Sequence, residues 1–121
     1  MKTCLIVDDS QVVRKVARRI VEALDFEAAE AADGVEGLAL CRAAMPHAVL
    51  LDRAMPNMDG LEFLRQLRRT PGGDKPVVVF CSADNEPAQI AAALDHGADE
   101  YIMKPFDGDI VAAKFVQAGL L

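Results

Sequence analysis

Short runs of apolar residues alternate along the chain with longer stretches in which apolar residues recur every three or four positions. The short runs are typical of strands buried in a parallel sheet, and the longer pattern is typical of amphipathic helices. Strands are predicted at residues 3–8, 27–31, 47–52, 76–81 and 100–103. Helices are predicted at residues 10–24, 34–44, 58–69, 86–97 and 108–118. This alternation predicts an α/β fold with a doubly wound, five-stranded parallel sheet and right-handed crossovers.

The first predicted helix has clear end signals and a clear period. Ser10 is well placed as its N-cap, because a serine hydroxyl can accept a hydrogen bond from an amide of the first turn. Its apolar residues predict one core-facing stripe: Val12, Val13, Val16, Ala17, Ile20, Val21 and Leu24. Its basic residues are interpreted as a solvated face: Arg14, Lys15, Arg18 and Arg19. In the fourth helix, Pro87 suits the first turn and Gly97 the C-terminal cap.

Polar residues stand where four of the predicted strands end. Asp8 and Asp9 follow the first strand, and Asp52 ends the third. Ser82 follows the fourth strand and Lys104 follows the fifth. In open α/β sheets the carboxyl ends of parallel strands meet at one edge, and ligands bind there. We therefore expect three carboxylates, one hydroxyl and one amine to share a pocket.

The chemistry of such a pocket favours phosphoryl transfer. Three close carboxylates repel one another, so the site calls for a divalent cation such as Mg²⁺ or Mn²⁺. With the cation and Lys104 present the pocket is close to neutral, and Asp52 could attack phosphorus and become an acyl phosphate. Ser82 could hydrogen-bond a phosphoryl oxygen. Taken singly, the acid pair could be a helix cap, Asp52 a turn residue and Ser82 an N-cap, but their order favours the functional interpretation.

Composition excludes several classes of function. The 121 residues, of which 52% are hydrophobic, predict one folded domain spanning 1–121. A net charge of −6 argues against direct nucleic-acid binding. No apolar stretch approaches the ~20 residues that cross a bilayer, and no signal-peptide pattern is present, so we expect a cytoplasmic protein with no membrane contact. Cys4, Cys41 and Cys81 are expected to be buried and reduced, and His47 and His96 fit no metal-ligand pattern.

Four motifs carry a family resemblance that covers essentially the whole chain. They are Val7-Asp8-Asp9-Ser10; Leu50-Leu51-Asp52 with Met55-Pro56-Asn57-Met58-Asp59-Gly60; Ser82-Ala83; and Tyr101-Ile102-Met103-Lys104-Pro105-Phe106. Together they resemble the receiver domain of bacterial two-component response regulators, most closely the single-domain chemotaxis type. The resemblance implies a flavodoxin-like fold with strand order 2-1-3-4-5.

The resemblance also implies roles for the acidic residues and the lysine. Asp52 would be the phosphoacceptor. Asp9, Asp52 and the backbone carbonyl of Ala54 would bind Mg²⁺ directly, and Asp8 would act through a metal-bound water. Lys104 would pair with Asp52 and with the phosphoryl group.

Further roles concern the conformational switch. Ser82 and Tyr101 would form the switch pair, and their movement would reshape the surface made by the fourth helix, the fifth strand and the fifth helix. Pro105 would follow a cis peptide bond, and Gly60 would serve a tight backbone turn.

Two positions beside the pocket, Ala54 and Asp84, would tune the lifetime of the phosphoryl group. Ile90 is expected on the switch surface, because Ala91, Leu94 and Ala98 would already supply the core-facing stripe of the fourth helix.

By this resemblance the chain is a signalling switch that catalyses only its own phosphorylation and dephosphorylation. The donor would be a histidine kinase or a histidine phosphotransfer protein, recognised by the first helix and the loop after the fifth strand. The chain would act on a downstream protein, as a monomer or as a weak phosphorylation-dependent dimer. A stand-alone regulator is favoured; the alternatives are a receiver that acts unphosphorylated and one excised from a multidomain regulator. A phosphohydrolase would need an acid in place of Ala54, and a nucleotide binder a Gly-rich loop after the first strand.

Overall fold

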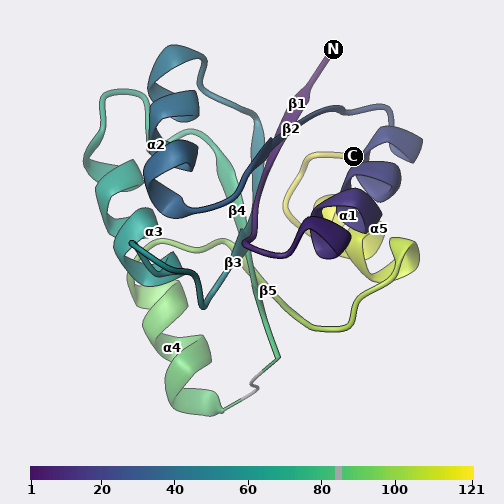
Figure 1. Ribbon diagram of the computed structural model, residues 1–121. Helices are drawn as coiled ribbons and strands as arrows, with labels where there is room; N and C mark the ends of the chain where they lie inside the picture. Colours follow the sequence, from purple (N-terminus) through teal and green to yellow (C-terminus); the bar gives the residue numbers. More distant parts are fainter. Residues whose placement is uncertain (84–85) are drawn as a thin grey trace.

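The computed structural model describes residues 1–83 and 86–121, which form one parallel sheet between two layers of helices (Figure 1). The strands are β1 (Thr3–Val7), β2 (Glu27–Ala31), β3 (Ala48–Asp52), β4 (Val77–Ser82) and β5 (Glu100–Met103). The helices are α1 (Gln11–Ala23), α2 (Gly34–Ala43), α3 (Gly60–Arg69), α4 (Pro87–Asp95) and α5 (Gly108–Gln117). The strand order β2-β1-β3-β4-β5 confirms the predicted doubly wound, flavodoxin-like topology.

The sheet separates two apolar cores, because successive residues of a strand point to opposite faces. The helices α2, α3 and α4 cover one face of the sheet (Figure 1). On this face, Leu51 and Phe80 belong to one core with Phe63 of α3. On the face covered by α1 and α5, Ile6 belongs to a second core with Phe115 of α5. This burial on both faces explains why β1, β3 and β4 are nearly continuous apolar runs in the sequence.

Fewer residues of α1 face the core than the apolar pattern predicts. Ala17 and Val21 are buried as expected, and Ser10 caps the helix by accepting a hydrogen bond from the amide of Val13. However, Val12 is 71% exposed and Val16 is 46% exposed. The periodicity therefore located the apolar face of the helix but not its limits.

The prediction for the core-facing stripe of α4 is wrong in part. Ala98 is buried, but Leu94 is 47% exposed and Ala91 is also exposed. Ala93 makes the buried contact instead, which corresponds to a rotation of the helix by about 100° relative to the prediction. Ile90, expected on the surface of α4, β5 and α5, is half-buried.

The basic residues of α1 are not simply a solvated face. Arg14 and Arg18 both pair with Glu30 of β2, at 3.1 and 2.6 Å, whereas Lys15 and Arg19 are exposed. The prediction failed because the helix pattern alone does not reveal that an acid of the neighbouring edge strand points to the same side of the sheet.

The cysteines are buried free thiols, as predicted, and burial raises the pKa of Cys4 and Cys81 to about 12 and that of Cys41 to about 11. Both histidines, His47 and His96, are exposed. Within the described residues, no helix combines the length and the apolar character needed to span a lipid bilayer.

One arginine ties together the two loops that precede β4 and β5. Arg68 of α3 donates hydrogen bonds of 2.6 to 2.9 Å to three backbone carbonyls, those of Gly73, Pro76 and Gly97. It also forms an ion pair of 3.0 Å with Asp99, directly before β5. This network lies at the amino ends of the strands, so its role is structural.

We expect Arg68→Met to lower the free energy of unfolding by about 2–4 kcal/mol, because three carbonyls lose their donor and Asp99 loses its ion-pair partner. Urea unfolding would measure the change. Arg69→Met is the matched control, since the neighbouring side chain is exposed and makes no hydrogen bond or ion pair with any described residue. Equal unfolding midpoints for the two variants would contradict the prediction.

Candidate functional site

The predicted polar residues meet at the carboxyl edge of the sheet. β1, β3 and β4 pair in a register that brings Asp52, the last residue of β3, beside the residues that follow β1. One carboxylate oxygen from each of Asp8, Asp9 and Asp52 lies within 4.8 Å of the other two. Ser82 ends β4, and Lys104 directly follows β5 at the same edge.

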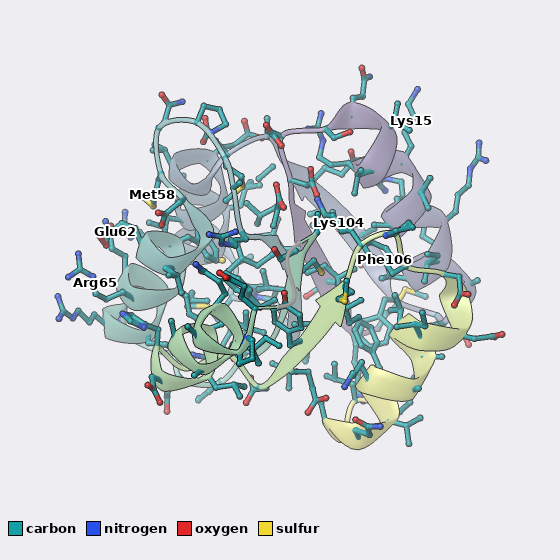
Figure 2. The ribbon with its side chains drawn as sticks, turned by 90° about the horizontal axis from the view of Figure 1, so that it is seen from below. Lys15, Met58, Glu62, Arg65, Lys104 and Phe106 are labelled. Carbon is teal, nitrogen blue, oxygen red and sulfur yellow. The ribbon has the colours of Figure 1, made fainter. Side chains whose placement is uncertain are left out.

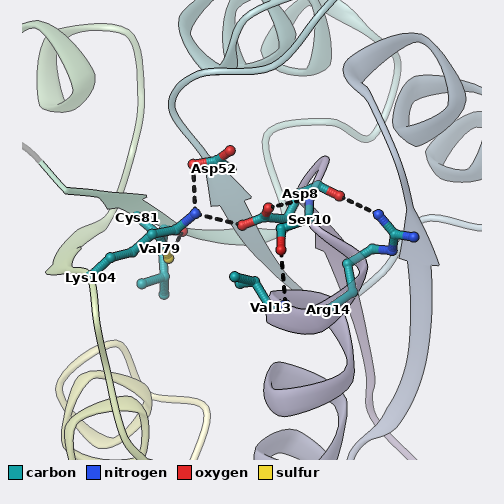
Figure 3. Close-up of polar contacts among 8 residues, drawn as sticks. All are labelled: Asp8, Ser10, Val13, Arg14, Asp52, Val79, Cys81 and Lys104. Carbon is teal, nitrogen blue, oxygen red and sulfur yellow. Dashed lines mark hydrogen bonds and ion pairs between the residues drawn. The ribbon is translucent and has the colours of Figure 1, made fainter.

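The two acids of the pair have different surroundings. Asp8 is buried, and its Oδ1 accepts a hydrogen bond of 2.9 Å from the amide of Ser10. Its Oδ2 accepts one of 2.7 Å from the ammonium of Lys104 (Figure 3). Asp9 is exposed, and its side chain has no hydrogen-bond or ion-pair partner in residues 1–83 and 86–121. The Asp9 carboxylate is therefore available to a ligand, whereas the Asp8 carboxylate is already held.

Lys104 lies between two buried acids, because its ammonium also donates to Asp52 at 2.9 Å (Figure 3). Burial alone would lower the pKa of Lys104, but the hydrogen bonds to Asp8 and Asp52 outweigh it and raise that pKa. The contact with Asp52 was predicted; the contact with Asp8 was not.

The charge of Asp52 is unfavourable in the absence of a cation. Burial raises the pKa of its carboxyl group, the charge of Asp8 adds to the effect, and the hydrogen bond from Lys104 opposes it. A dication beside Asp52 and Asp9 would relieve this penalty. Carboxylate oxygens are the ligands that Mg²⁺ prefers, and one of the three acids, Asp9, has no side-chain partner among the described residues, so the residues fit the expected cation.

The two residues of the expected switch pair lie on neighbouring strands. Ser82 is 3% exposed at the end of β4. Tyr101 of β5 is half-buried, and its ring stacks on that of Phe80 with 6.3 Å between centroids. In this structure the Tyr101 ring therefore lies against the core on the α3 side of the sheet.

Gly60 has a different role from the one expected. Its φ is not in the left-handed region; the positive φ of this loop is at Asn57, at 68°. The Gly60 amide donates to the carbonyl of Arg53 at 2.8 Å, and a Cβ at Gly60 would lie 2.4 Å from the carbonyl oxygen of Asp52. A glycine is needed because the start of α3 passes so close to the end of β3.

Three further predicted positions have different outcomes. The peptide bond between Lys104 and Pro105 is cis, as predicted. Ala54 is an exposed residue of the loop between β3 and α3. Asp84 lies outside the described residues.

An apolar pocket of about 340 Å³ opens beside the site, between α1 and the loop after β5. Its lining consists of Val12, Val13, Val16, Ala83, Lys104, Pro105 and Phe106. The exposed valines that periodicity assigned to the core thus form one wall of a pocket that also contains the site lysine. Sequence reasoning missed it because an apolar stripe does not reveal which part of it remains uncovered.

Comparisons with known proteins agree with this geometry. Residues 4–115 match the family model described as response regulator receiver domain. The response regulators MprA of Mycobacterium sp. (strain KMS) and of Mycobacterium avium (strain 104) are 45% and 43% identical to the chain over 102 residues, which is 84% of the chain and 44% of each relative. The chain therefore spans less than half the length of these relatives.

Two solved structures have the same fold. The chemotaxis protein CheY4 of Vibrio cholerae matches with a TM-score of 0.91 and 26% identity, over 100% of this chain and 99% of that one. A CheY-like receiver domain protein from Methanospirillum hungatei JF-1 matches with a TM-score of 0.87 and 29% identity, over 99% of this chain and 94% of that one. Fold, site geometry and family match agree, and the chain belongs to the response regulator receiver domain family.

Proposed function

We propose that this chain is the phosphorylatable switch of a two-component signalling system, in which Asp52 accepts a phosphoryl group from a histidine kinase or a histidine phosphotransfer protein. The position of Asp52 carries the proposal. Its carboxylate ends a buried strand, lies with two further acids whose oxygens are within 4.8 Å, and is 2.9 Å from Lys104. Because like charges repel, such a cluster is unfavourable unless cations offset its charge, and a dication beside Lys104 would also attract an anionic phosphoryl donor.

The proposed chemistry is a single displacement at phosphorus. An oxygen of Asp52 forms the new O–P bond while the N–P bond of the donor phosphohistidine breaks, and the donor imidazole leaves with the electron pair. Lys104, already hydrogen-bonded to Asp52, offsets charge on the transferred oxygens. Mg²⁺, held by Asp9, Asp52 and the carbonyl of Ala54 with Asp8 acting through a water, would supply the remaining charge neutralisation. The product is an acyl phosphate on the chain itself, so the chain changes state instead of turning over a substrate.

The pocket beside α1 is the proposed docking place for the phosphoryl donor. Its wall of Val12, Val13 and Val16 is apolar, and Lys104 connects it to Asp52. A partner that buries these valines would present its phosphohistidine at the carboxyl edge of the sheet. Removal of exposed apolar surface from water would supply binding energy.

The test uses purified protein, Mg²⁺ and acetyl phosphate, followed by intact-mass spectrometry. With Mg²⁺ we expect the mass to increase by one phosphoryl group. When EDTA is added before acetyl phosphate, we expect no increase. No gain, or a gain that EDTA leaves undiminished, would contradict the proposal.

Phosphorylation is expected to move Tyr101 through Ser82. A phosphoryl group on Asp52 would give the Ser82 hydroxyl a charged acceptor, and a hydrogen bond of this kind is worth roughly 1.5–3 kcal/mol. A bias of about 2 kcal/mol shifts a two-state equilibrium about thirtyfold. Movement of Ser82 would make room for the Tyr101 ring to change its position and so reshape the surface of α4, β5 and α5.

The measurement is the NMR spectrum of the Tyr101 ring with and without beryllofluoride, a phosphoryl mimic. We expect a shift in wild type, its loss in Ser82→Ala and its recovery in Ser82→Thr, which retains a hydroxyl. An identical Tyr101 environment in both states of the wild type would show that this coupling does not exist.

A further inference from the structure

Four polar groups of Asp8 have hydrogen-bond partners: its amide, its carbonyl and its two carboxylate oxygens. One of these partners is Arg14 of α1. The amide of Asp8 donates to Ala31 at 3.1 Å, and its two carboxylate oxygens accept from Ser10 and Lys104. Its carbonyl oxygen accepts a hydrogen bond of 2.7 Å from Nη1 of Arg14 (Figure 3). This carbonyl belongs to the peptide unit that joins Asp8 to Asp9, so Arg14 fixes the orientation of the backbone that leads into Asp9.

Arg14 is itself held in place. Its Nε donates to Oε1 of Glu30 on β2 at 3.1 Å, and Oε2 of the same carboxylate accepts from Arg18 at 2.6 Å. The hydrogen bonds from Arg18 and then Arg14 lower the pKa of Glu30, so this carboxylate remains charged at neutral pH. The Arg14 side chain is only 16% exposed. A continuous series of hydrogen bonds therefore connects Glu30 of the edge strand, through Arg14, to the backbone of the acid pair.

We propose that Arg14 is a positioning residue for the cation site, which holds the Asp8–Asp9 peptide so that the Asp9 carboxylate remains beside those of Asp8 and Asp52. Arg14 does not touch the cation in this arrangement. The inference rests on the proposed function, because it assigns a purpose to the geometry of the acid cluster. The Asp9 side chain has no partner of its own within the described residues, so its position depends on the backbone that carries it.

Positioning and simple electrostatics predict opposite results for the same substitution. Arg14→Met removes a positive charge near an acidic site. If Arg14 acted only through its charge, its removal would strengthen Mg²⁺ binding. If Arg14 positions the acid pair, its removal weakens binding, because the ligands must then be ordered when the cation arrives.

The experiment is an Mg²⁺ titration followed by backbone amide shifts in wild type, Arg14→Met and Lys15→Met. Lys15 is the matched control, because it is the next residue of the same helix and its side chain points away from the molecule (Figure 2). We expect Arg14→Met to weaken Mg²⁺ binding about tenfold, as loss of a group behind a metal ligand commonly does. Lys15→Met should bind Mg²⁺ as well as wild type or slightly better. Equal or tighter binding by Arg14→Met would overturn the inference.

A second readout in metal-free protein separates this inference from the proposed function. The Ser10 amide, which donates to Asp8, should exchange its hydrogen with solvent faster in Arg14→Met than in Lys15→Met. The free energy of global unfolding in urea should change less than the free energy of local opening at Ser10. A wild type that fails to bind Mg²⁺ would overturn the proposed function. A wild type that binds, with Ser10 protection unchanged in Arg14→Met, would overturn the inference alone.

Arg14→Lys keeps the measurement decisive if Arg14→Met does not fold. Lysine retains the charge, but its single ammonium cannot reproduce the separate contacts that Nη1 and Nε of Arg14 make with the Asp8 carbonyl and with Glu30. We expect the Mg²⁺ affinity and the Ser10 protection of Arg14→Lys to be lower than those of wild type. Where Arg14→Met also folds, both values should be higher in Arg14→Lys than in Arg14→Met. If Arg14→Lys has the Mg²⁺ affinity and the Ser10 protection of the wild type, the hydrogen bonds of Arg14 to Glu30 and to the Asp8 carbonyl do not position the acid pair.

Discussion

Asp52→Asn is expected to take up no phosphoryl group under conditions in which the wild type is labelled by acetyl phosphate and Mg²⁺. The carboxamide lacks the anionic oxygen that attacks phosphorus. Neither neighbouring acid is placed to replace it, since Asp8 is held by Ser10 and Lys104, and Asp9 is exposed at the rim. Intact-mass spectrometry measures the loss, and peptide mapping of the wild type locates the modified residue.

The control for this variant is its stability without metal. Burial raises the pKa of Asp52, so its ionisation opposes folding. A raised folded-state pKa means that the contribution of this group is favourable at low pH and is lost as the pH rises through that pKa. Asp52→Asn does not share this loss and should be at least as stable as wild type at neutral pH, with the difference shrinking in acid. Urea unfolding at both pH values checks this, and full labelling of a folded variant would contradict the assignment of Asp52.

Asp9→Ala is expected to weaken Mg²⁺ binding by more than about tenfold, because it removes the acid that has no competing partner within the described residues. At a concentration ten times its dissociation constant, Mg²⁺ should stabilise the wild type by about 1.4 kcal/mol, and the variant should gain much less. Without metal the variant should be no less stable than wild type, since one of three repelling carboxylates is gone.

Amide-shift titration gives the affinity, and thermal unfolding with and without Mg²⁺ gives the stabilisation. Asp74→Ala is the control, because it removes the same charge from an exposed loop at the opposite end of the sheet. Unchanged Mg²⁺ affinity in Asp9→Ala would exclude Asp9 as a ligand.

The sequence was sufficient to predict the sheet and the place of the site. Strands buried on both faces are continuous apolar runs, and polar residues such as Asp52 and Lys104 that end these runs must meet when the strands are parallel. These features depend on the order of residues along the chain, which a single sequence contains. The strand order needed the family resemblance, because several orders would satisfy the same alternation.

Features that depend on the relative placement of elements were beyond sequence reasoning. The period of α1 does not reveal that Val12 and Val16 extend past the covered face, or that Arg14 meets Glu30 and the Asp8 carbonyl. Likewise, Gly60 was expected to serve a turn, but it is required by the close approach of α3 to the carbonyl of Asp52. Such contacts join segments whose separation is fixed only once the helices pack on the sheet.

The most direct test of the central claim is a crystal structure of the protein with Mg²⁺ and beryllofluoride. We expect beryllium bonded to a carboxylate oxygen of Asp52, with Mg²⁺ beside it on Asp9, Asp52 and the carbonyl of Ala54, and Lys104 contacting a fluorine. Beryllofluoride on another residue, or a cation bound away from Asp9 and Asp52, would contradict the account.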